Sequence, residues 1–141
     1  MFINTLNSAL HTLFFHPRLR LLRRGQLLVA LGVFAYMALS SSPGVWTSAL
    51  SDKLLHFLGN LLLIGSIWVA FFGSINGRLA ILFAVIYSLT IESFQAFTTM
   101  RHPDLFDAAA NLLGIFVGFG VCRLSGHYIL RLEARKAEPE E

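Results

Sequence analysis

Six polar side chains recur at helical spacing inside apolar stretches of this sequence, and they are the residues best placed to do chemistry. They are Lys53, His56, Glu92, Gln95, Asp107 and Asn111. Within each consecutive pair the spacing is three or four residues, so the two members share one face of a helix. An ionisable group at hydrocarbon depth costs at least about 2.5–3.5 kcal/mol, and residues of this kind therefore mark a functional site or a buried ion pair.

The chemistry available to these residues is proton exchange and the recognition of anions. Glu92 and His56 are the candidate catalytic residues, because a carboxylate or an imidazole can act as a general base. Lys53 and Arg101 would bind an anionic headgroup or stabilise developing negative charge. The structural alternatives stay open: Glu92 would fix helix packing as an ion pair, and the two cations would extend to the membrane surface.

Neither a metal centre nor a cofactor is predicted. His56, Glu92, His102 and Asp104 have side chains that suit zinc or manganese, but their positions follow no tight ligand spacing. The single cysteine, Cys122, excludes an internal disulfide and any cysteine-based zinc site.

The elements that must position these residues are predicted to be transmembrane helices. Hydrophobic residues make up 55% of the 141 residues and charged residues 13%, whereas a soluble domain has about 25% charged residues. A span needs about 20 mainly apolar residues. Four segments approach that length, namely residues 26–42, 53–72, 78–97 and 107–124. We therefore predict an all-α integral membrane protein whose residues 26–124 form a four-transmembrane-helix bundle.

The segment before the first span is predicted to be a short interfacial amphipathic helix over residues 1–15. Its apolar face is formed by residues four apart, Phe2, Leu6, Leu10 and Phe14. Pro17 and four arginines follow, and we therefore interpret residues 1–25 as this amphipathic helix together with a basic juxtamembrane segment. A signal peptide is the rival interpretation, but no small-residue cleavage site follows. Residues 125–141 are predicted to form a cytoplasmic tail that is disordered from Glu133 onward.

The placement of basic residues predicts that both termini are cytoplasmic. With the N-terminus inside, the inner segments carry nine lysines and arginines, and the outer segments carry only Lys53 and Arg101. The loops over residues 41–52 and 98–106 then face outward, with Trp46 at the interface. Membrane lipid is the expected partner of the inner basic residues, and nucleic-acid binding is not predicted.

With this topology the costly polar residues gather at the outer ends of the second, third and fourth spans. We predict that their polar faces turn inward and form a pocket open to the outer surface. In that pocket Glu92 is expected to pair with Lys53, His56 or Arg101.

Two features of the fourth span concern its neighbours. Asp104 and Asp107 lie near its start, where an aspartate also stabilises a helix end. Gly114 and Gly118 form a small-xxx-small pattern, which permits close contact with another helix. We predict that this glycine face is available to a membrane-protein partner.

Three sequence blocks, in this order and spacing, resemble the VanZ-like family. The first is Asp52-Lys53-Leu54-Leu55-His56-Phe57, the second is Glu92-Ser93-Phe94-Gln95, and the third is the spread Arg101, Asp104, Asp107, Asn111 and Gly114. The resemblance covers residues 52–118. It implies a small protein of the bacterial cytoplasmic (inner) membrane that belongs to the cell envelope. The founding member of the family is associated with low-level resistance to the glycopeptide teicoplanin.

These observations support three hypotheses about function. In the first, which we favour, the outer pocket binds an anionic lipid, a lipid-linked glycan precursor or a glycopeptide. Its ligand-binding residues would be Lys53, His56, Glu92, Gln95, Arg101, Asp104, Asp107 and Asn111. In the second, the protein is a membrane-embedded transferase or hydrolase that uses Glu92 or His56. In the third, it is a structural subunit of a membrane complex.

Overall fold

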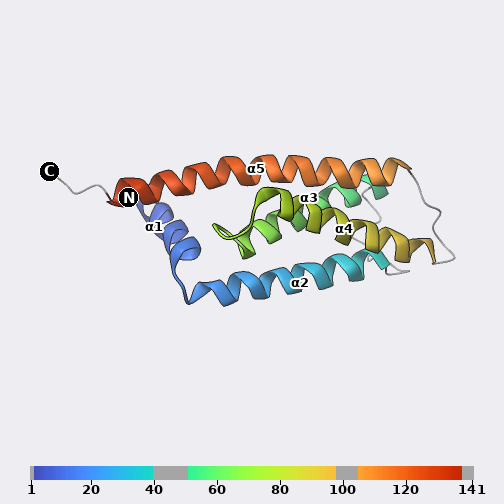
Figure 1. Cartoon of the computed structure of the whole chain (residues 1–141), viewed down its shortest axis with the longest axis horizontal. Helices are drawn as coiled ribbons and strands as arrows, with labels where there is room; N and C mark the ends of the chain where they lie inside the picture. Colours follow the sequence, from blue (N-terminus) through green and yellow to red (C-terminus); the bar gives the residue numbers. More distant parts are fainter. Residues whose placement is uncertain (1, 40–50, 98–104, 138–141) are drawn as a thin grey trace.

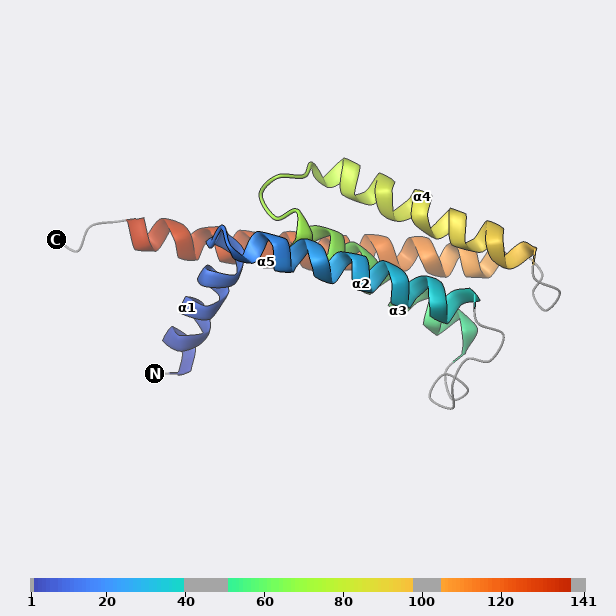
Figure 2. The ribbon, with the colours of Figure 1, turned by 90° about the horizontal axis from the view of Figure 1, so that it is seen from below.

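The computed structural model describes residues 2–39, 51–97 and 105–137, which form five helices. They are α1 (Phe2–Phe15), α2 (Leu19–Leu39), α3 (Asp52–Ala70), α4 (Gly77–Ala96) and α5 (Leu105–Ala137). Successive helices from α2 to α5 run in opposite directions along one bundle (Figure 1). Figure 2 shows that α1 leaves one end of this bundle at a steep angle.

The two ends of the bundle differ in chemistry. We call the end at which α3 and α5 begin the polar end, because it carries Asp52, His56 and Asp107. The opposite end, at which α2 begins, carries Arg20, Arg23 and further arginines, and we call it the basic end. The first residues of α2 and the last residues of α5 both lie at the basic end (Figure 1).

The four long helices have the length and composition of membrane spans. The qualifying segments are α2, α3, α4 and residues Leu105–Ala134 of α5. Their outward faces expose large apolar side chains such as Leu28, Leu62 and Leu124, which suits contact with lipid. Over residues 2–39, 51–97 and 105–137, an all-helical fold with four helices able to span a membrane is therefore confirmed. The cytoplasmic placement of the termini and the interfacial position of α1 stay predictions.

Two helices extend further than their apolar segments. α2 begins at Leu19 rather than at residue 26, because the intervening leucines and arginines favour a helix and Pro17 starts the preceding turn. α5 continues to Ala137, so the prediction of disorder is wrong for residues 133–137, whereas residues 138–141 lie outside the described part of the chain. The physical reason is contact with α1: the His11 ring lies against the Glu133 carboxylate, and the Tyr128 hydroxyl donates a hydrogen bond to Asn7.

The helix α3 lies at the centre of the hydrophobic core. Its side chains Leu63, Ile64 and Ile67 are almost completely buried. They belong to one cluster with small residues of α4 and with Ile115 of α5. The α3–α4 connection turns at Gly73, whose positive φ of 73° suits glycine.

The closest contact between helices joins α5 to α3. A Cβ atom placed on Gly114 would lie 2.2 Å from the Phe57 carbonyl oxygen, and one on Gly118 would lie 2.5 Å from the Cγ2 atom of Ile64. Only glycine permits this separation of the two backbones. The glycine face that the sequence offered to a partner protein is therefore occupied by α3 of the same chain.

The helix α2 is joined to its neighbours by hydrogen bonds from neutral side chains to main-chain carbonyls. They are Gln26 Nε2 to Ser66 (2.9 Å), Tyr87 Oη to Leu31 (2.7 Å) and Gln95 Nε2 to Ala38 (2.8 Å). Such bonds satisfy polar groups at a depth where water is scarce, and they hold α2 against both α3 and α4.

The Gly114→Ala variant is expected to lower the melting temperature of the protein in detergent. The added methyl group would overlap the Phe57 carbonyl, so α3 and α5 must separate. Overpacking a filled contact costs about 1–3 kcal/mol. Thermal unfolding followed by circular dichroism measures the change.

The matched control is Gly120→Ala on the same helix, because nothing lies within 4 Å of a Cβ atom at that position. We expect this control to melt at the wild-type temperature or slightly above it. Equal melting temperatures for Gly114→Ala and Gly120→Ala would contradict the close contact of α3 with α5.

Candidate functional site

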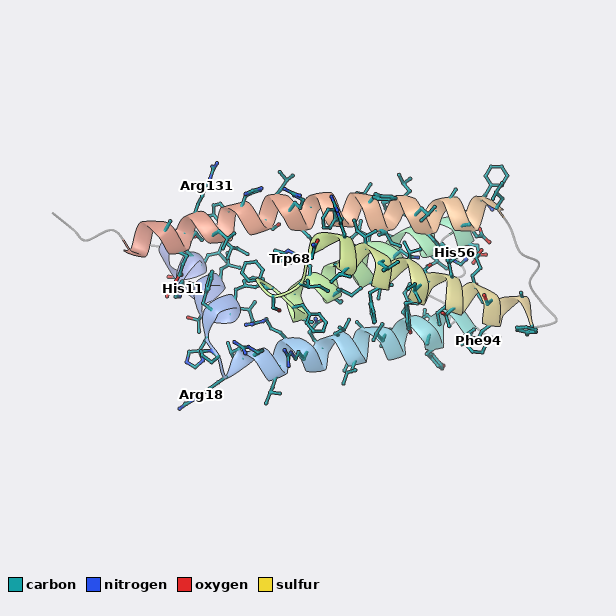
Figure 3. All side chains as sticks on the ribbon, in the orientation of Figure 1. His11, Arg18, His56, Trp68, Phe94 and Arg131 are labelled. Atoms are coloured by element: carbon teal, nitrogen blue, oxygen red, sulfur yellow. The ribbon has the colours of Figure 1, made fainter. Side chains whose placement is uncertain are left out.

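Seven polar residues from three helices meet at the polar end, and we call them the polar cluster. They are Asp52, Lys53, His56 and Asn60 of α3, Glu92 of α4, and Asp107 and Asn111 of α5. Figure 3 shows His56 at this end, beside the start of α5. The start of α3 is set by Ser51, whose hydroxyl accepts a hydrogen bond from the Leu54 amide at 3.3 Å.

The centre of the polar cluster is the side-chain amide of Asn111. Its Nδ2 atom donates to the Glu92 carboxylate at 3.1 Å. Its Oδ1 atom accepts from Asn60 Nδ2 at 2.6 Å and lies 3.1 Å from His56 Nδ1. Asn111 is only 5% exposed, so one buried amide connects all three helices.

This arrangement determines which imidazole nitrogen of His56 carries a proton. Because Asn111 Oδ1 can only accept, His56 Nδ1 must be the donor. The other nitrogen, Nε2, faces the carboxylates of Asp52 and Asp107 at 3.9 and 3.8 Å. Both distances exceed a hydrogen bond, although the His56 side chain is only 10% exposed.

Lys53 lies at the exposed edge of the polar cluster. Its Nζ atom lies 3.6 Å from Asp107 Oδ1 and 5.8 Å from the centre of the Phe106 ring. The side chain of Lys53 is 51% exposed, whereas Asp107 is largely buried. Lys53 can therefore reach a bound molecule while it remains close to a carboxylate.

The partner of Glu92 differs from the one that we expected. Glu92 accepts a hydrogen bond from Asn111, and among the described residues no direct ion pair joins Glu92 to Lys53 or His56. The physical reason is that the close approach of α5 inserts an amide between α3 and α4. The third predicted partner, Arg101, lies outside the described residues.

Five of the eight predicted ligand-binding residues lie together in the polar cluster: Lys53, His56, Glu92, Asp107 and Asn111. Gln95 binds α2 through the Ala38 carbonyl instead. Arg101 and Asp104 lie outside the described residues, as does His102.

Two members of the polar cluster were absent from the predicted ligand set, namely Asp52 and Asn60. Their spacing of four residues on either side of His56 was a usable signal, because it places all three on one face of α3. The two catalytic candidates, Glu92 and His56, are joined through Asn111.

One part of the polar cluster has the side chains that a metal ion needs. Single ligand atoms of Asp52, His56 and Asp107 lie within 4.8 Å of one another. Two carboxylates and an imidazole suit a divalent ion such as zinc or manganese. The hydrogen bond from His56 Nδ1 to Asn111 is the arrangement that orients metal-binding histidines. This set shares only His56 with the four residues considered from the sequence.

The charges of the polar cluster restrict what it can bind. Its described residues comprise three carboxylates and one ammonium group, together with the imidazole. Carboxylates and amides accept hydrogen bonds from hydroxyl groups, and they attract cations. An anionic group would therefore be held at the exposed Lys53 and not beside the carboxylates.

A comparison with protein families shows which family the chain matches. The model of the family described as VanZ/LLP1 matches residues 2–126, which include all the residues of the polar cluster. Comparisons with curated proteins and with solved structures found no match.

The Asn111→Asp variant is expected to be less stable than the wild type. It removes the donor to Glu92 and places two carboxylates in contact, at a cost of about 1–3 kcal/mol or more. The Glu92→Gln variant keeps an acceptor for the Asn111 amide and should melt close to the wild type. Thermal unfolding in detergent measures both changes.

The double variant Asn111→Asp with Glu92→Gln provides the decisive comparison. The amide at position 92 can donate to the carboxylate at position 111, which still accepts from Asn60 and His56. We therefore expect the second substitution to recover most of the lost stability. A double variant no more stable than Asn111→Asp alone would be inconsistent with the hydrogen bond between these positions.

Proposed function

The chain belongs to the VanZ/LLP1 family, and we propose that this multi-pass membrane protein binds the headgroup of an anionic envelope molecule at its polar end. The molecule would be an anionic lipid, a lipid-linked glycan precursor or a glycopeptide. In this proposal the polar end faces the outer leaflet of the bacterial inner membrane, with both termini in the cytoplasm. The observation that carries it is the network around Asn111, which holds the Glu92 carboxylate and the His56 ring close to Asp107 and the half-exposed Lys53.

The residues of the polar cluster contact different groups of the ligand, according to their chemistry and exposure. Lys53 binds a phosphate or carboxylate of the ligand, because the Lys53 side chain is half exposed. Asp52 and Asp107 accept hydrogen bonds from sugar hydroxyls. In this proposal Arg101 and Asp104 add contacts from the outer loop.

The surroundings of the polar end suit a ligand with a lipid tail. Side chains such as Leu54, Leu58 and Phe94, close to the polar cluster in sequence, are exposed and apolar. An acyl or polyprenyl chain can lie along such a surface while its headgroup binds between helices. The proposal includes a link to teicoplanin-type resistance, in which the ligand is the lipid-bearing glycopeptide or the precursor that it recognises.

The test measures binding of three probes to the purified protein in detergent: phosphatidylglycerol, a polyprenyl-diphosphate-linked disaccharide and teicoplanin. Lys53→Met is expected to weaken the bound probe about tenfold, which corresponds to one lost charge contact of about 1.4 kcal/mol. Arg101→Ala is expected to weaken it similarly. Ser93→Ala is the control, because the Ser93 hydroxyl is exposed and bonds within its own helix.

The expected pattern is binding of at least one probe that depends on Lys53 and is indifferent to Ser93. Failure of the folded wild-type protein to bind any of the three probes would exclude the proposal. Equal binding by the wild type, Lys53→Met and Arg101→Ala would exclude it as well.

A second candidate function is a metal-assisted hydrolase or transferase, which the three ligand atoms of Asp52, His56 and Asp107 favour. A bound divalent ion would polarise a phosphoryl or carbonyl oxygen. Asn111 would hold His56 with Nε2 free to bind the ion, and Glu92 would act as general base.

The two candidates differ in the expected effect of Lys53→Met. Because Lys53 competes for Asp107, its removal should leave binding of Zn²⁺ or Mn²⁺ unchanged or stronger, while it weakens headgroup binding. His56→Gln should abolish metal binding. Calorimetric titration with each metal alone checks this, and absence of saturable binding by the wild type would exclude the metal-dependent candidate.

A further inference from the structure

A cavity lies at the basic end, far from the polar cluster. Its volume is about 310 Å³, close to the lower limit of small-molecule sites. Residues of α1, α2 and the α3–α4 connection form most of its wall, and Leu130 of α5 completes it. We call it the arginine pocket, because Arg20, Arg23 and Arg24 line it together with Phe14 and Phe72.

Arg23 is the unusual member of the arginine pocket. It is only 6% exposed, and its Nη1 atom donates to the carbonyl oxygen of Leu13 in the last turns of α1. Its Nε atom is buried and has no hydrogen-bond partner within the described residues. An arginine that merely extends to the membrane surface keeps its guanidinium in water, whereas this one is enclosed with an unsatisfied donor.

The electrostatics of the arginine pocket are those of an anion site. Three guanidinium groups lie within five residues of α2, and no acidic side chain lines the cavity. Glu133, on the neighbouring part of α5, is paired with His11. Arg24 lies 5.8 Å from the centre of the Phe71 ring, which orients its guanidinium without neutralising it. The like charges of these neighbouring arginines repel, so an anion bound between them would stabilise the structure.

We propose that the arginine pocket binds a phosphate group, carried by an anionic membrane lipid or by a soluble phosphate compound. The planar guanidinium fork matches phosphate oxygens in pairs, and Arg23 Nε supplies a donor that the protein leaves unused. Phe14, Phe72 and Leu130 offer an apolar wall for the carbon chain attached to the phosphate. This site is independent of the function proposed for the polar cluster.

The position of the arginine pocket favours a lipid as the source of the phosphate. The pocket lies where the apolar part of α2 begins and α3 ends, which is the level of a lipid headgroup. Trp68 adds a third ring beside the wall formed by Phe14 and Phe72. The ring centre of Phe14 lies 4.6 Å from that of Phe72 and 5.4 Å from that of Trp68. A headgroup could therefore bind the arginines while its glycerol contacts these rings.

The experiment measures lipid binding to the full-length protein by native mass spectrometry, with phosphatidylglycerol and phosphatidylcholine as probes. The wild type is expected to bind phosphatidylglycerol at least tenfold more tightly than phosphatidylcholine. Arg23→Gln should remove most of the preference that remains in Lys53→Met, in which the headgroup contact proposed at the polar end is lost. In the same Lys53→Met background, Arg20→Gln and Arg24→Gln should each reduce the preference several-fold. Inorganic phosphate is titrated in a separate arm, with and without lipid.

The matched control is Arg18→Gln, which removes the same charge from a neighbouring exposed residue that does not line the pocket. Figure 3 shows Arg18 pointing away from the bundle. If inorganic phosphate binds alone and displaces the lipid at low millimolar concentration, the phosphate site stands and its ligand is a soluble compound.

Three results would overturn the proposal. The first is equal binding of the two lipids without binding of inorganic phosphate. The second is an equal loss in Arg18→Gln and Arg23→Gln, which would indicate unspecific attraction. The third applies if Arg23→Gln does not fold: wild-type binding by Arg20→Gln and Arg24→Gln, whose side chains are exposed, would then exclude the site.

Discussion

The close approach of α5 to α3 at Gly114 is the constraint on which the rest of the structure depends. Without a side chain at that position the two backbones come close enough for Asn60 and Asn111 to share a hydrogen bond of 2.6 Å. The same approach brings Asn111 within reach of Glu92 on α4. In a membrane these polar groups have no water to replace a lost partner. The packing of α3 against α5 and the geometry of the polar cluster therefore depend on each other. A wider separation of these helices would leave the Asn60 and Asn111 amides and the Glu92 carboxylate without their hydrogen bonds.

Much of the fold was predictable, because spans, turns and polar faces each have a local signal. The bounds of α3 and α4 lie within two residues of the expected ones, since Gly73 and Asn76 mark the turn between them. The helical spacing of Lys53 and His56, and the position of Asp107 near the start of the last span, likewise predicted that these residues lie at the same depth in the bundle. What could not be predicted was the partner of each group. Spacing within a helix does not say that an amide would separate Glu92 from the cations, or that Gln95 would turn toward α2.

The helix ends show a related limit. The apolar pattern indicates where the lipid-facing part of a helix ends. The helix itself continues as long as its residues favour helix and another element packs against it. Arg20 and Arg23 are good helix formers, so α2 includes them although they are charged. Residues after Leu124 in α5 remain helical beside α1, and that contact depends on residues more than a hundred positions away, such as Asn7 and Tyr128. Long-range contacts of this kind leave no trace in a local pattern.

The length of α5 has a consequence for the position of α1. Its 33 residues extend about 50 Å, whereas the hydrocarbon layer is about 30 Å thick. α3, with 19 residues, is close to that thickness. About 20 Å of α5 therefore exceeds the length of α3, and Figure 1 shows this extra length beyond the bundle at the basic end. Because α1 is attached to this part of α5 by His11 and Asn7, the distance of α1 from the bundle is set by contacts within the protein.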